Sequence, residues 1–316
     1  MRDIVSTASE VFKKYLGIEI GGTKLQIVVG DAEAKILERR RFAVNKAEGA
    51  TGIRKQIEGA VKEIVKTTVL KAVGVGYGGP VDWRTGKICC SHHIEGWSDF
   101  ELGKWLAELT GAPVSVDNDA NVAALGEAFH GAGVGANPVF YVTLGSGVGG
   151  GLIVDGRIYH GATPGEVEIG HVRLDRAGTI LESRCSGWSV DARIRVLADT
   201  EPASVLAQLS REKPGNGARH LTEALRRNDA AAWRILQEVA EDLAFGLSHV
   251  TQLFHPEVII LGGGLSNLGE PLRAAVAEAL GPWVMKAFAP GPRVLLAGLK
   301  EDAVPVGALE LGKIRS

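Results

Sequence analysis

The same order of short segments occurs twice in this chain of 316 residues and restricts the folds that it can adopt. The run YLGIEIGGTKLQIVVGD, which starts at Tyr15, is typical of two β-strands joined by a glycine-opened turn. The run VFYVTLGSGVGGGLIVDGRI, which starts at Val139, again shows strand, glycine turn and strand. This similar order indicates an internal structural duplication, although no residue-level repeat accompanies it.

The segments between these runs indicate the fold class. Residues 48–67 have apolar side chains at helical spacing, and APVSVDND followed by ANVAALGEAFHGAG is typical of a strand and a helix. A meander of three strands followed by alternating strands and helices predicts an α/β lobe with a mixed sheet. Helices are expected to dominate residues 189–253, before a buried strand in PEVIILGGGLS and a closing helix.

The length of the chain suits about two domains, because single cores stop growing at roughly 250–300 residues. We expect two lobes with a cleft between them, the first comprising residues 1–131 and the second residues 132–303. The last helix, residues 304–316, is expected to pack back onto the first lobe.

Composition argues against several classes of function. Thirty-five basic and 37 acidic residues give a net charge of −2, so no global field favours nucleic acid or an anionic membrane. Three cysteines do not suggest a disulfide framework and favour a reducing cytoplasm. No signal peptide is evident, and no run approaches the roughly 20 apolar residues of a membrane span. We expect a soluble cytoplasmic protein.

Three glycine loops follow predicted strands and expose backbone N–H groups that could approach phosphates. The loops are Gly21-Gly22-Thr23-Lys24, Gly145-Ser146-Gly147 and Gly262-Gly263-Gly264. A tight hairpin turn is the plain alternative for the first loop. The second begins a formal match to the dinucleotide fingerprint, but a strand rather than a helix is expected after it, which favours a hairpin that contacts phosphates. Together the loops predict a nucleotide held between two lobes.

The segment VDNDAN places Asn118, Asp119 and Asn121 at a strand-to-helix junction, where α/β proteins bind ligands. Capping of the following helix explains one of these polar residues. It does not explain three, so we predict a catalytic role for Asp119.

The chain resembles the ROK family (repressor, open reading frame, kinase), which comprises bacterial sugar kinases and related regulators. LGIEIGGTK, GYGGPVD, VDNDANVAALGEAFHGAG, VTLGSGVGGGLIVDGRI, EIGH, LESRCSG, PEVIILGGGLS and DAVPVGAL all occur in family order and cover nearly the whole chain. The resemblance implies the two-lobed actin-like ATPase (ribonuclease H-like) fold. It also implies transfer of the ATP γ-phosphoryl group to a sugar hydroxyl, with glucose as the first candidate.

Roles for single residues follow from this resemblance. Asp119 would be the general base that takes the hydroxyl proton. The first two glycine loops would hold the phosphates and the third would line the adenosine, while Mg²⁺ would bridge phosphate oxygens with a possible contribution from Glu19. The residues implied in sugar binding are Asn118, Asp119, Glu168, His171 and Glu182. The family also implies a homodimer or homotetramer.

The chain departs from the family in the stretch between His171 and Glu182, where family members usually carry the cysteine cluster of a zinc module. This stretch has no cysteine, and Cys185 follows it, so we predict no structural zinc and interpret Cys185 as a core residue. Two further departures bear on the pocket. Glu19 stands where the family usually has aspartate, and Glu166-Val167 replaces the residues expected before Glu168. Either Glu166 or a backbone carbonyl would then orient His171.

The segment ICCSHHIEGW contains Cys89, Cys90, His92 and His93, the other cluster that resembles a metal site. Adjacent side chains on an extended segment point to opposite faces, so we predict no metal there. A histidine of this segment is a candidate for sugar contact. The alternative function is a sugar-binding regulator or sensor without kinase activity. Because DNA-binding regulators of the family carry an N-terminal helix-turn-helix, and about fourteen residues precede the first strand, we expect the kinase.

Overall fold

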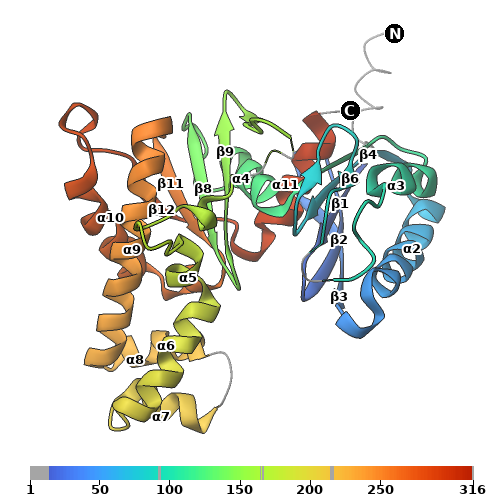
Figure 1. Ribbon diagram of the computed structural model, residues 1–316. Coiled ribbons are helices and arrows are strands. Elements are labelled where there is room, and N and C mark those ends of the chain that lie inside the picture. The colour runs from blue at the N-terminus through green and yellow to red at the C-terminus, as the bar shows by residue number, and fades with distance from the viewer. Residues whose placement is uncertain (1–13, 92–93, 164, 166, 214–216, 315–316) are drawn as a thin grey trace. The chain divides into compact units, whose positions relative to one another are not determined.

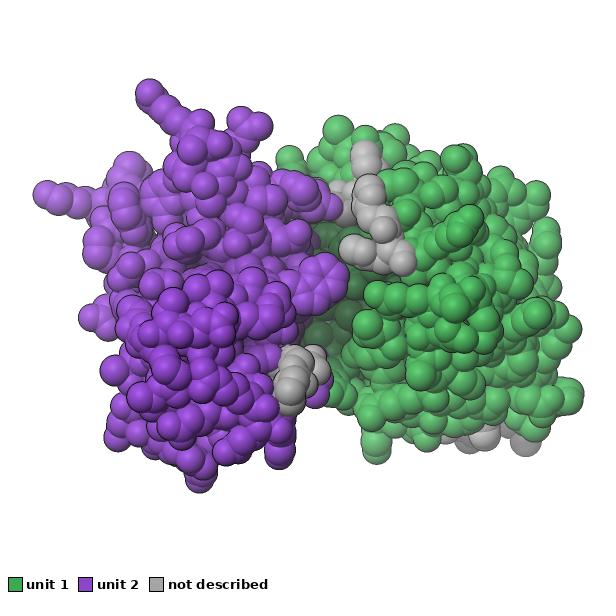
Figure 2. All heavy atoms as spheres, turned by 60° about the horizontal axis from the view of Figure 1, so that its bottom comes forward, with its two compact units in different colours: residues 1–134, 151–167, 301–316 green, residues 135–150, 168–300 purple. Residues whose placement is uncertain are grey.

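The computed structural model describes residues 14–91, 94–163, 165, 167–213 and 217–314. The chain divides into two compact units (Figure 2). The first contains the described residues up to Val134, Gly151–Val167 and the residues from Glu301 onwards, and the second contains Gly135–Gly150 and Glu168–Lys300. Residues 151–167 thus group with the first unit, and the assignment of 1–131 and 132–303 as domains stays a prediction.

The first sheet has the strand order β3-β2-β1-β4-β7. Its strands are β1 (Lys14–Ile20), β2 (Lys24–Gly30), β3 (Ile36–Ala43), β4 (Leu70–Tyr77) and β7 (Val114–Asn118). β1 and β3 both run antiparallel to β2, whereas β4 runs parallel to its neighbours β1 and β7. The predicted meander and mixed sheet are confirmed. The carboxyl ends of β1, β4 and β7 therefore meet at one edge of the sheet.

Helices cover both faces of this sheet (Figure 1). One face packs on α2 (Gly49–Thr67) and α3 (Leu102–Thr110), and the other on α4 (Asp119–His130) and α11 (Ala303–Ile314). The turn η1 (Lys46–Glu48) precedes α2, and a small hairpin of β5 (Val81–Asp82) and β6 (Lys87–Ile88) follows β4. The core between the sheet and α2 consists of aliphatic side chains together with Trp97, which is fully buried.

The contact of α11 with β4 and α4 requires glycine. A Cβ atom at Gly74 of β4 would lie 1.8 Å from the backbone oxygen of Ala308. A Cβ atom at Gly307 of α11 would lie 1.8 Å from the backbone oxygen of Val122 in α4. The backbones approach too closely for any side chain, so the end of the chain is built into the first unit.

The second sheet repeats the order of the first, as β10-β9-β8-β11-β12. Its strands are β8 (Val139–Leu144), β9 (Val148–Val154), β10 (Arg157–Ile158), β11 (Val258–Gly262) and β12 (Arg293–Leu296). β11 runs parallel to both β8 and β12, and β10 runs antiparallel to β9. The predicted duplication is therefore confirmed at the level of topology. β12 was not predicted, because a run of only four residues carries too weak a pattern.

The second unit is rich in helices, as predicted. Its α-helices are α5 (Leu181–Cys185), α6 (Gly187–Thr200), α7 (Val205–Glu212), α8 (Leu221–Arg226), α9 (Ala230–Phe254) and α10 (Glu270–Leu280). Short 3-10 turns are η2 (Ile169–His171), η3 (Gly217–His220), η4 (Gly264–Leu268), η5 (Gly281–Trp283) and η6 (Lys286–Phe288), and η7 (Lys300–Asp302) leads into α11. Among the described helices, none is both long and apolar enough to cross a membrane.

Candidate functional site

Three parallel strands of the first unit end level with one another. Ile20 of β1 pairs with Tyr77 of β4, and Tyr77 pairs with Asn118 of β7. The residues that follow these strands, Gly21, Gly78 and Asp119, therefore lie together at one edge of the sheet. A Cβ atom at Gly78 would lie 3.3 Å from Asp119 Oδ2. Glycine at 78 thus leaves the space beside this carboxylate open.

The junction of β7 and α4 separates the roles of Asn118 and Asp119. Asn118 is the N-cap of α4, and its Oδ1 accepts hydrogen bonds from the backbone N–H of Ala120 at 2.9 Å and of Asn121 at 3.4 Å. Its Nδ2 donates to the carbonyl oxygen of Gly79 at 3.3 Å. Capping of α4 therefore explains the polar side chain at Asn118 but does not explain the one at Asp119.

Asp119 lies in the first turn of α4, and its surroundings favour the protonated acid. Its side chain keeps some access to solvent, yet protein atoms closely surround the carboxyl group. Burial is the main cause that raises the pKa of Asp119 to about 7, and the negative charge of Glu19 adds to it. The N–H of Ala120 and the cation of Lys24 oppose the shift only in part. Such a carboxyl group can accept and release a proton near neutral pH.

Glu19 of β1 supplies that neighbouring negative charge from a buried position. Its Oε2 accepts a hydrogen bond of 2.7 Å from Gln26 Nε2, and its Oε1 lies 3.0 Å from Lys24 Nζ. Burial raises the pKa of Glu19, while the hydrogen bonds and the charge of Lys24 lower it. Lys24 keeps about half of its side chain exposed, since its relative side-chain exposure is 46%. It is placed to meet a second anion from the solvent side.

Three of the loop glycines are not required by their surroundings. A Cβ atom at Gly22 would have no neighbour within 4 Å. At Gly145 and Gly264, the nearest atom would be 3.9 Å away. None of the three has a positive φ. Folding alone therefore does not explain these glycines, and each leaves open space beside its loop.

Three other loop glycines are explained by packing. A Cβ atom at Gly147 would lie 2.5 Å from Glu182 Oε2, and one at Gly262 would lie 2.1 Å from the hydroxyl oxygen of Tyr141. Gly263 has a φ of +78° and would meet the backbone of Leu144. β9 follows the loop at Gly145–Gly147 directly, which confirms that this loop is not a dinucleotide fingerprint.

The predicted sugar residues of the second unit lie around the loop that precedes β9. Glu182 lies in the first turn of α5, and its Oε2 accepts a hydrogen bond of 2.8 Å from the backbone N–H of Val148. Glu168 precedes the turn η2, His171 is the last residue of that turn, and both side chains are exposed. A Cβ atom at Gly170, inside that turn, would lie 2.2 Å from the backbone oxygen of Val148. Sequence reasoning missed the contact of Glu182 with the loop, because the partners are 34 residues apart.

Sequence reasoning also missed a cluster that adjoins Asp119. His160 Nε2 lies 2.6 Å from Asp117 Oδ2, and the His160 ring stacks on Trp83. Asp117 precedes Asn118 in β7, whereas His160 follows β10. No spacing rule links two polar residues that are 43 positions apart.

The described residues include no group of three or more His, Cys, Asp or Glu side chains that could hold a metal ion. Cys185 is 0% exposed, and burial raises the pKa of its thiol to about 12, so its interpretation as a core residue is confirmed. His92, His93 and Glu166 lie outside the described residues. The predictions made for them, and the expected lack of zinc, stay predictions.

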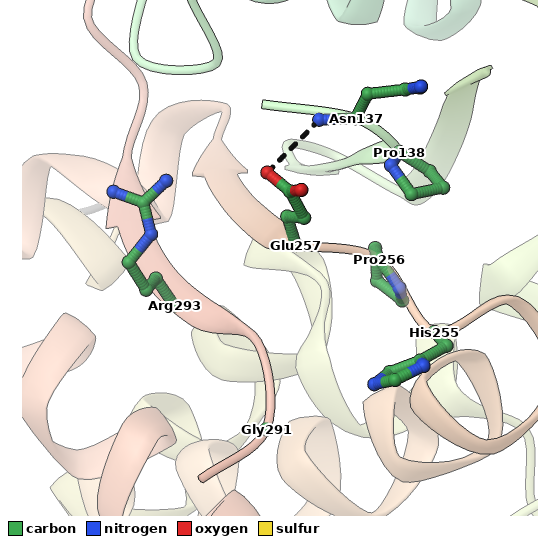
Figure 3. Close-up of a pocket in the computed structure, with 7 residues that line it drawn as sticks. All are labelled: Asn137, Pro138, His255, Pro256, Glu257, Gly291 and Arg293. Carbon is green, nitrogen blue, oxygen red and sulfur yellow. Dashed lines mark hydrogen bonds between the residues drawn. The ribbon is translucent and has the colours of Figure 1, made fainter. Parts of the chain in front are cut away.

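A pocket of the second unit has a volume of about 500 Å³ (Figure 3). Its lining residues are Asn137, Pro138, His255, Pro256, Glu257, Gly291 and Arg293. They sit at the amino ends of β8, β11 and β12, whereas the loops at Gly145 and Gly263 follow carboxyl ends. The pocket therefore lies at the opposite edge of the sheet from these loops.

Comparison with known proteins identifies similar chains. The family model described as ROK family matches residues 15–314. A glucokinase of Halalkalibacterium halodurans is 32% identical over 308 residues, which cover 93% of this chain and 93% of that protein. The structure of a ROK family glucokinase from Streptomyces griseus in complex with glucose and AMPPNP has a TM-score of 0.82 at 32% identity, and covers 95% of this chain and 99% of that chain.

The structure of a ROK family transcriptional regulator has a TM-score of 0.85 at 18% identity, and covers 98% of this chain and 82% of that chain. At that identity, the likeness shows the fold alone. The fold class predicted from the sequence, an actin-like ATPase fold with two mixed sheets, is confirmed.

Proposed function

Because the chain belongs to the ROK family, we propose that it is an ATP-dependent sugar kinase that transfers the γ-phosphoryl group of ATP to a hydroxyl group of a hexose. The observation that carries the proposal is Asp119, a carboxyl group with a pKa of about 7 at the carboxyl edge of the first sheet. Glucose is the first candidate substrate, since the glucokinase relatives act on it by name.

Asp119 is the general base of the proposed reaction. Its ionised carboxylate takes the proton of the sugar hydroxyl while the hydroxyl oxygen bonds to the γ-phosphorus and the bond from phosphorus to the β-phosphate oxygen breaks. The products are the sugar phosphate and ADP. A base with a pKa close to the working pH is ionised in a large share of molecules and still basic enough to accept the proton. A positioned base of this kind contributes about a hundred- to ten-thousand-fold in rate.

The glycine loops would hold the nucleotide. Gly22 and Gly145 leave open space where a phosphate group can approach backbone N–H groups, and Lys24 adds a partly exposed cation. Ser146 and Thr23 bring hydroxyl groups to the same loops, and Gly264 would leave room for the adenosine. The support for this assignment is that the fold does not require glycine at positions 22, 145 and 264.

Mg²⁺ would accompany ATP and neutralise charge on its phosphate oxygens. Glu19 is compatible with a contact through a metal-bound water. Each oxygen of an ionised carboxylate has more than one lone pair, and Oε2 contacts Gln26 while Oε1 contacts Lys24, so each oxygen can accept a further hydrogen bond. The chemistry of this donor suits Mg²⁺, which binds few carboxylates and retains much of its water.

The sugar would be bound by Asn118, Glu168, His171 and Glu182. Carboxylates accept hydrogen bonds from hydroxyl groups, whereas amide and imidazole groups can both donate and accept, so together they suit a polyol. Glu168 and His171 have exposed side chains that are accessible to a ligand. Glu182 uses Oε2 to hold Val148, so Oε1 is the atom that we assign to the sugar.

We further propose that the protein works in the cytoplasm as a homodimer or homotetramer. Exposed Leu253, Phe254, Trp283 and Met285, which belong to one part of the second unit around the end of α9 and the turn η5, support an interface between copies. Sedimentation of the purified protein tests this: a monomer at micromolar concentration would refute it.

The direct test of function is release of ADP from Mg²⁺-ATP in the presence of single sugars. The panel is glucose, mannose, fructose, allose, N-acetylated amino sugars and cyclitols. We expect one hexose to stand out, and Asp119→Asn to lower its kcat by at least about a hundredfold. A folded variant that loses less than about tenfold would show that Asp119 is not the base. Sugar binding without ADP release in the wild type would instead favour the regulator or sensor.

A further inference from the structure

Asp117 is an almost fully buried carboxylate next to the proposed sugar residue Asn118 and within two residues of the proposed base. Its Oδ1 accepts hydrogen bonds from the backbone N–H of Asn118 at 2.9 Å and from Asn121 Nδ2 at 3.1 Å. Its Oδ2 lies 2.6 Å from His160 Nε2. At this distance the carboxyl group and the imidazole nitrogen share a hydrogen bond.

The His160 ring is fixed in place on more than one side. It stacks on Trp83 with a distance of 4.2 Å between ring centroids and an angle of 14° between planes. Only 9% of the His160 side chain is exposed. Gly165 has a φ of +79°, and a Cβ atom there would lie 3.0 Å from His160 Cβ and 3.3 Å from Trp83 Cδ1. Gly165 thus lies close against the stacked rings.

Asn121 connects the same segments a second time. Its side chain is 0% exposed, and its Nδ2 donates both to Asp117 Oδ1 and to the carbonyl oxygen of Gly165 at 3.3 Å. Three parts of the chain that are distant in sequence therefore meet here: the β5–β6 turn, the β7–α4 junction, and the pair His160 and Gly165. All three belong to the first unit.

We propose that His160 is a positioning residue for the sugar side of the reaction. Through Asp117, it holds the β7–α4 junction that carries Asn118 and Asp119. Through its stacking on Trp83, it also holds the segment after β10 beside this junction. The contact thus fixes the stretch of sequence that supplies Asn118 and Asp119. The inference rests on the proposed function for its kinetic effect, whereas the structural role of the contact can be tested without it.

The test compares three variants of the full chain. His160→Phe keeps a ring that can stack on Trp83 but removes the ring nitrogen that contacts Asp117. His160→Gln restores an N–H group at the end of the side chain. The matched control is His130→Phe, because His130 Nε2 makes a similar contact of 2.9 Å with the buried carboxylate of Glu310 in the same unit. His130 ends α4, about 16 Å from Asp119 at 1.5 Å per residue.

Steady-state kinetics provide the first readout. Small misplacement of groups that orient a substrate lowers rates strongly, and we expect His160→Phe to raise the KM for the sugar about tenfold. The KM for ATP should change by less than about twofold, and His160→Gln should recover most of the loss. His130→Phe should lower the melting temperature about as much as His160→Phe while its sugar KM stays within about twofold of wild type. Equal kinetics in His160→Phe and His130→Phe would overturn the proposal.

Hydrogen–deuterium exchange provides a second readout that needs no activity. Peptides that cover residues 114–121 and 157–163 should exchange faster in His160→Phe than in wild type, and unchanged in His130→Phe. Wild-type protection in these peptides of His160→Phe would overturn the positioning role even if no sugar is phosphorylated. A wild type without activity on any sugar refutes the proposed function instead. If His160→Phe does not fold, Asp117→Asn, which keeps the shape and alters the acceptor, is measured in its place.

Discussion

The charged form of Asp119, which the proposed reaction needs, destabilises the folded protein. Its pKa of about 7 lies above the ordinary value of 3.8 for the same group, because burial and Glu19 disfavour its charge. A group whose pKa is raised by folding binds its proton more tightly in the folded state, so stability is greatest below the ordinary pKa and falls as pH rises towards the folded value. The carboxylate that the reaction needs thus weakens the fold at neutral pH.

Asp119→Asn should therefore stabilise the protein in alkaline buffer, because it removes a charge that burial disfavours. We expect its advantage over wild type in free energy of unfolding to shrink by about 2.6 kcal/mol between about pH 8 and about pH 5, since each unit of pKa difference corresponds to about 1.4 kcal/mol. Urea unfolding at both pH values measures this. The exposed Asp199→Asn serves as control, and an equal pH response in both variants would contradict the raised pKa.

The roles of single residues were predictable from the sequence where they depend on neighbouring residues in the chain. A strand-to-helix junction identified Asp119, and the same pattern left capping and sugar contact open for Asn118, which the structure shows to cap α4. The pattern could not link Asp117 to His160 or Glu182 to Val148. Those contacts depend on how the sheets bring distant segments together, and no local propensity encodes them.

At the scale of elements, the glycine turns divide into those that packing requires and those that it does not. Gly263 needs its positive φ, and Gly262 lies against Tyr141, whereas Gly22 meets no neighbouring atom. Glycine in such an open position costs conformational entropy on folding and gives no packing advantage in return. A ligand that approaches the backbone closely provides a reason for it.

Gly22→Ala should leave stability nearly unchanged and weaken nucleotide binding. The added methyl group meets nothing within the protein, but it enters the space that we assign to phosphate. We expect the KM for ATP to rise about tenfold, as for a loss of about 1.4 kcal/mol of binding, while the sugar KM changes little. The control is Gly59→Ala on the exposed face of α2, where a Cβ atom is also free of neighbours and should stabilise the helix by about 0.5–1 kcal/mol without kinetic effect. An unaltered KM for ATP in Gly22→Ala would contradict the phosphate assignment.

Elements with strong periodicity were predicted well. The meander of the first sheet, α2 and α4 follow from alternation, helical spacing and capping residues. β12 and the small hairpin of β5 and β6 were not predicted, since strands of two to four residues leave almost no pattern.

At the scale of the whole molecule, two sheets share one strand order, and the first and last described segments of the chain both belong to the first unit. The repeated order was predicted from the two strand–turn–strand runs. The close approach of α11 to β4 and α4 was not predicted in detail. The need for glycine at Gly74, Gly126 and Gly307 arises from contacts with the backbone of an element that is distant in sequence.

Gly307→Ala should therefore disrupt the first unit. Its methyl group would lie within 1.8 Å of a backbone oxygen, which a side-chain rotation cannot relieve. We expect a loss of about 3 kcal/mol in free energy of unfolding, at the upper end of overpacking effects. Gly281→Ala is the control, because a Cβ atom there meets nothing within 4 Å. Urea unfolding of both variants measures the difference, and a loss below about 1 kcal/mol in Gly307→Ala would show that α11 can move away without cost.

The pH dependence of kcat/KM for the best sugar tests directly whether Asp119 is the base. If Asp119 is the base and must be ionised, kcat/KM should rise about tenfold per pH unit in acid and level off above a midpoint near its pKa of about 7. Asp119→Asn should remove both this rise and most of the activity. A wild-type profile that is flat between about pH 5.5 and about pH 8, or a rise that persists in Asp119→Asn, would show that Asp119 is not the base.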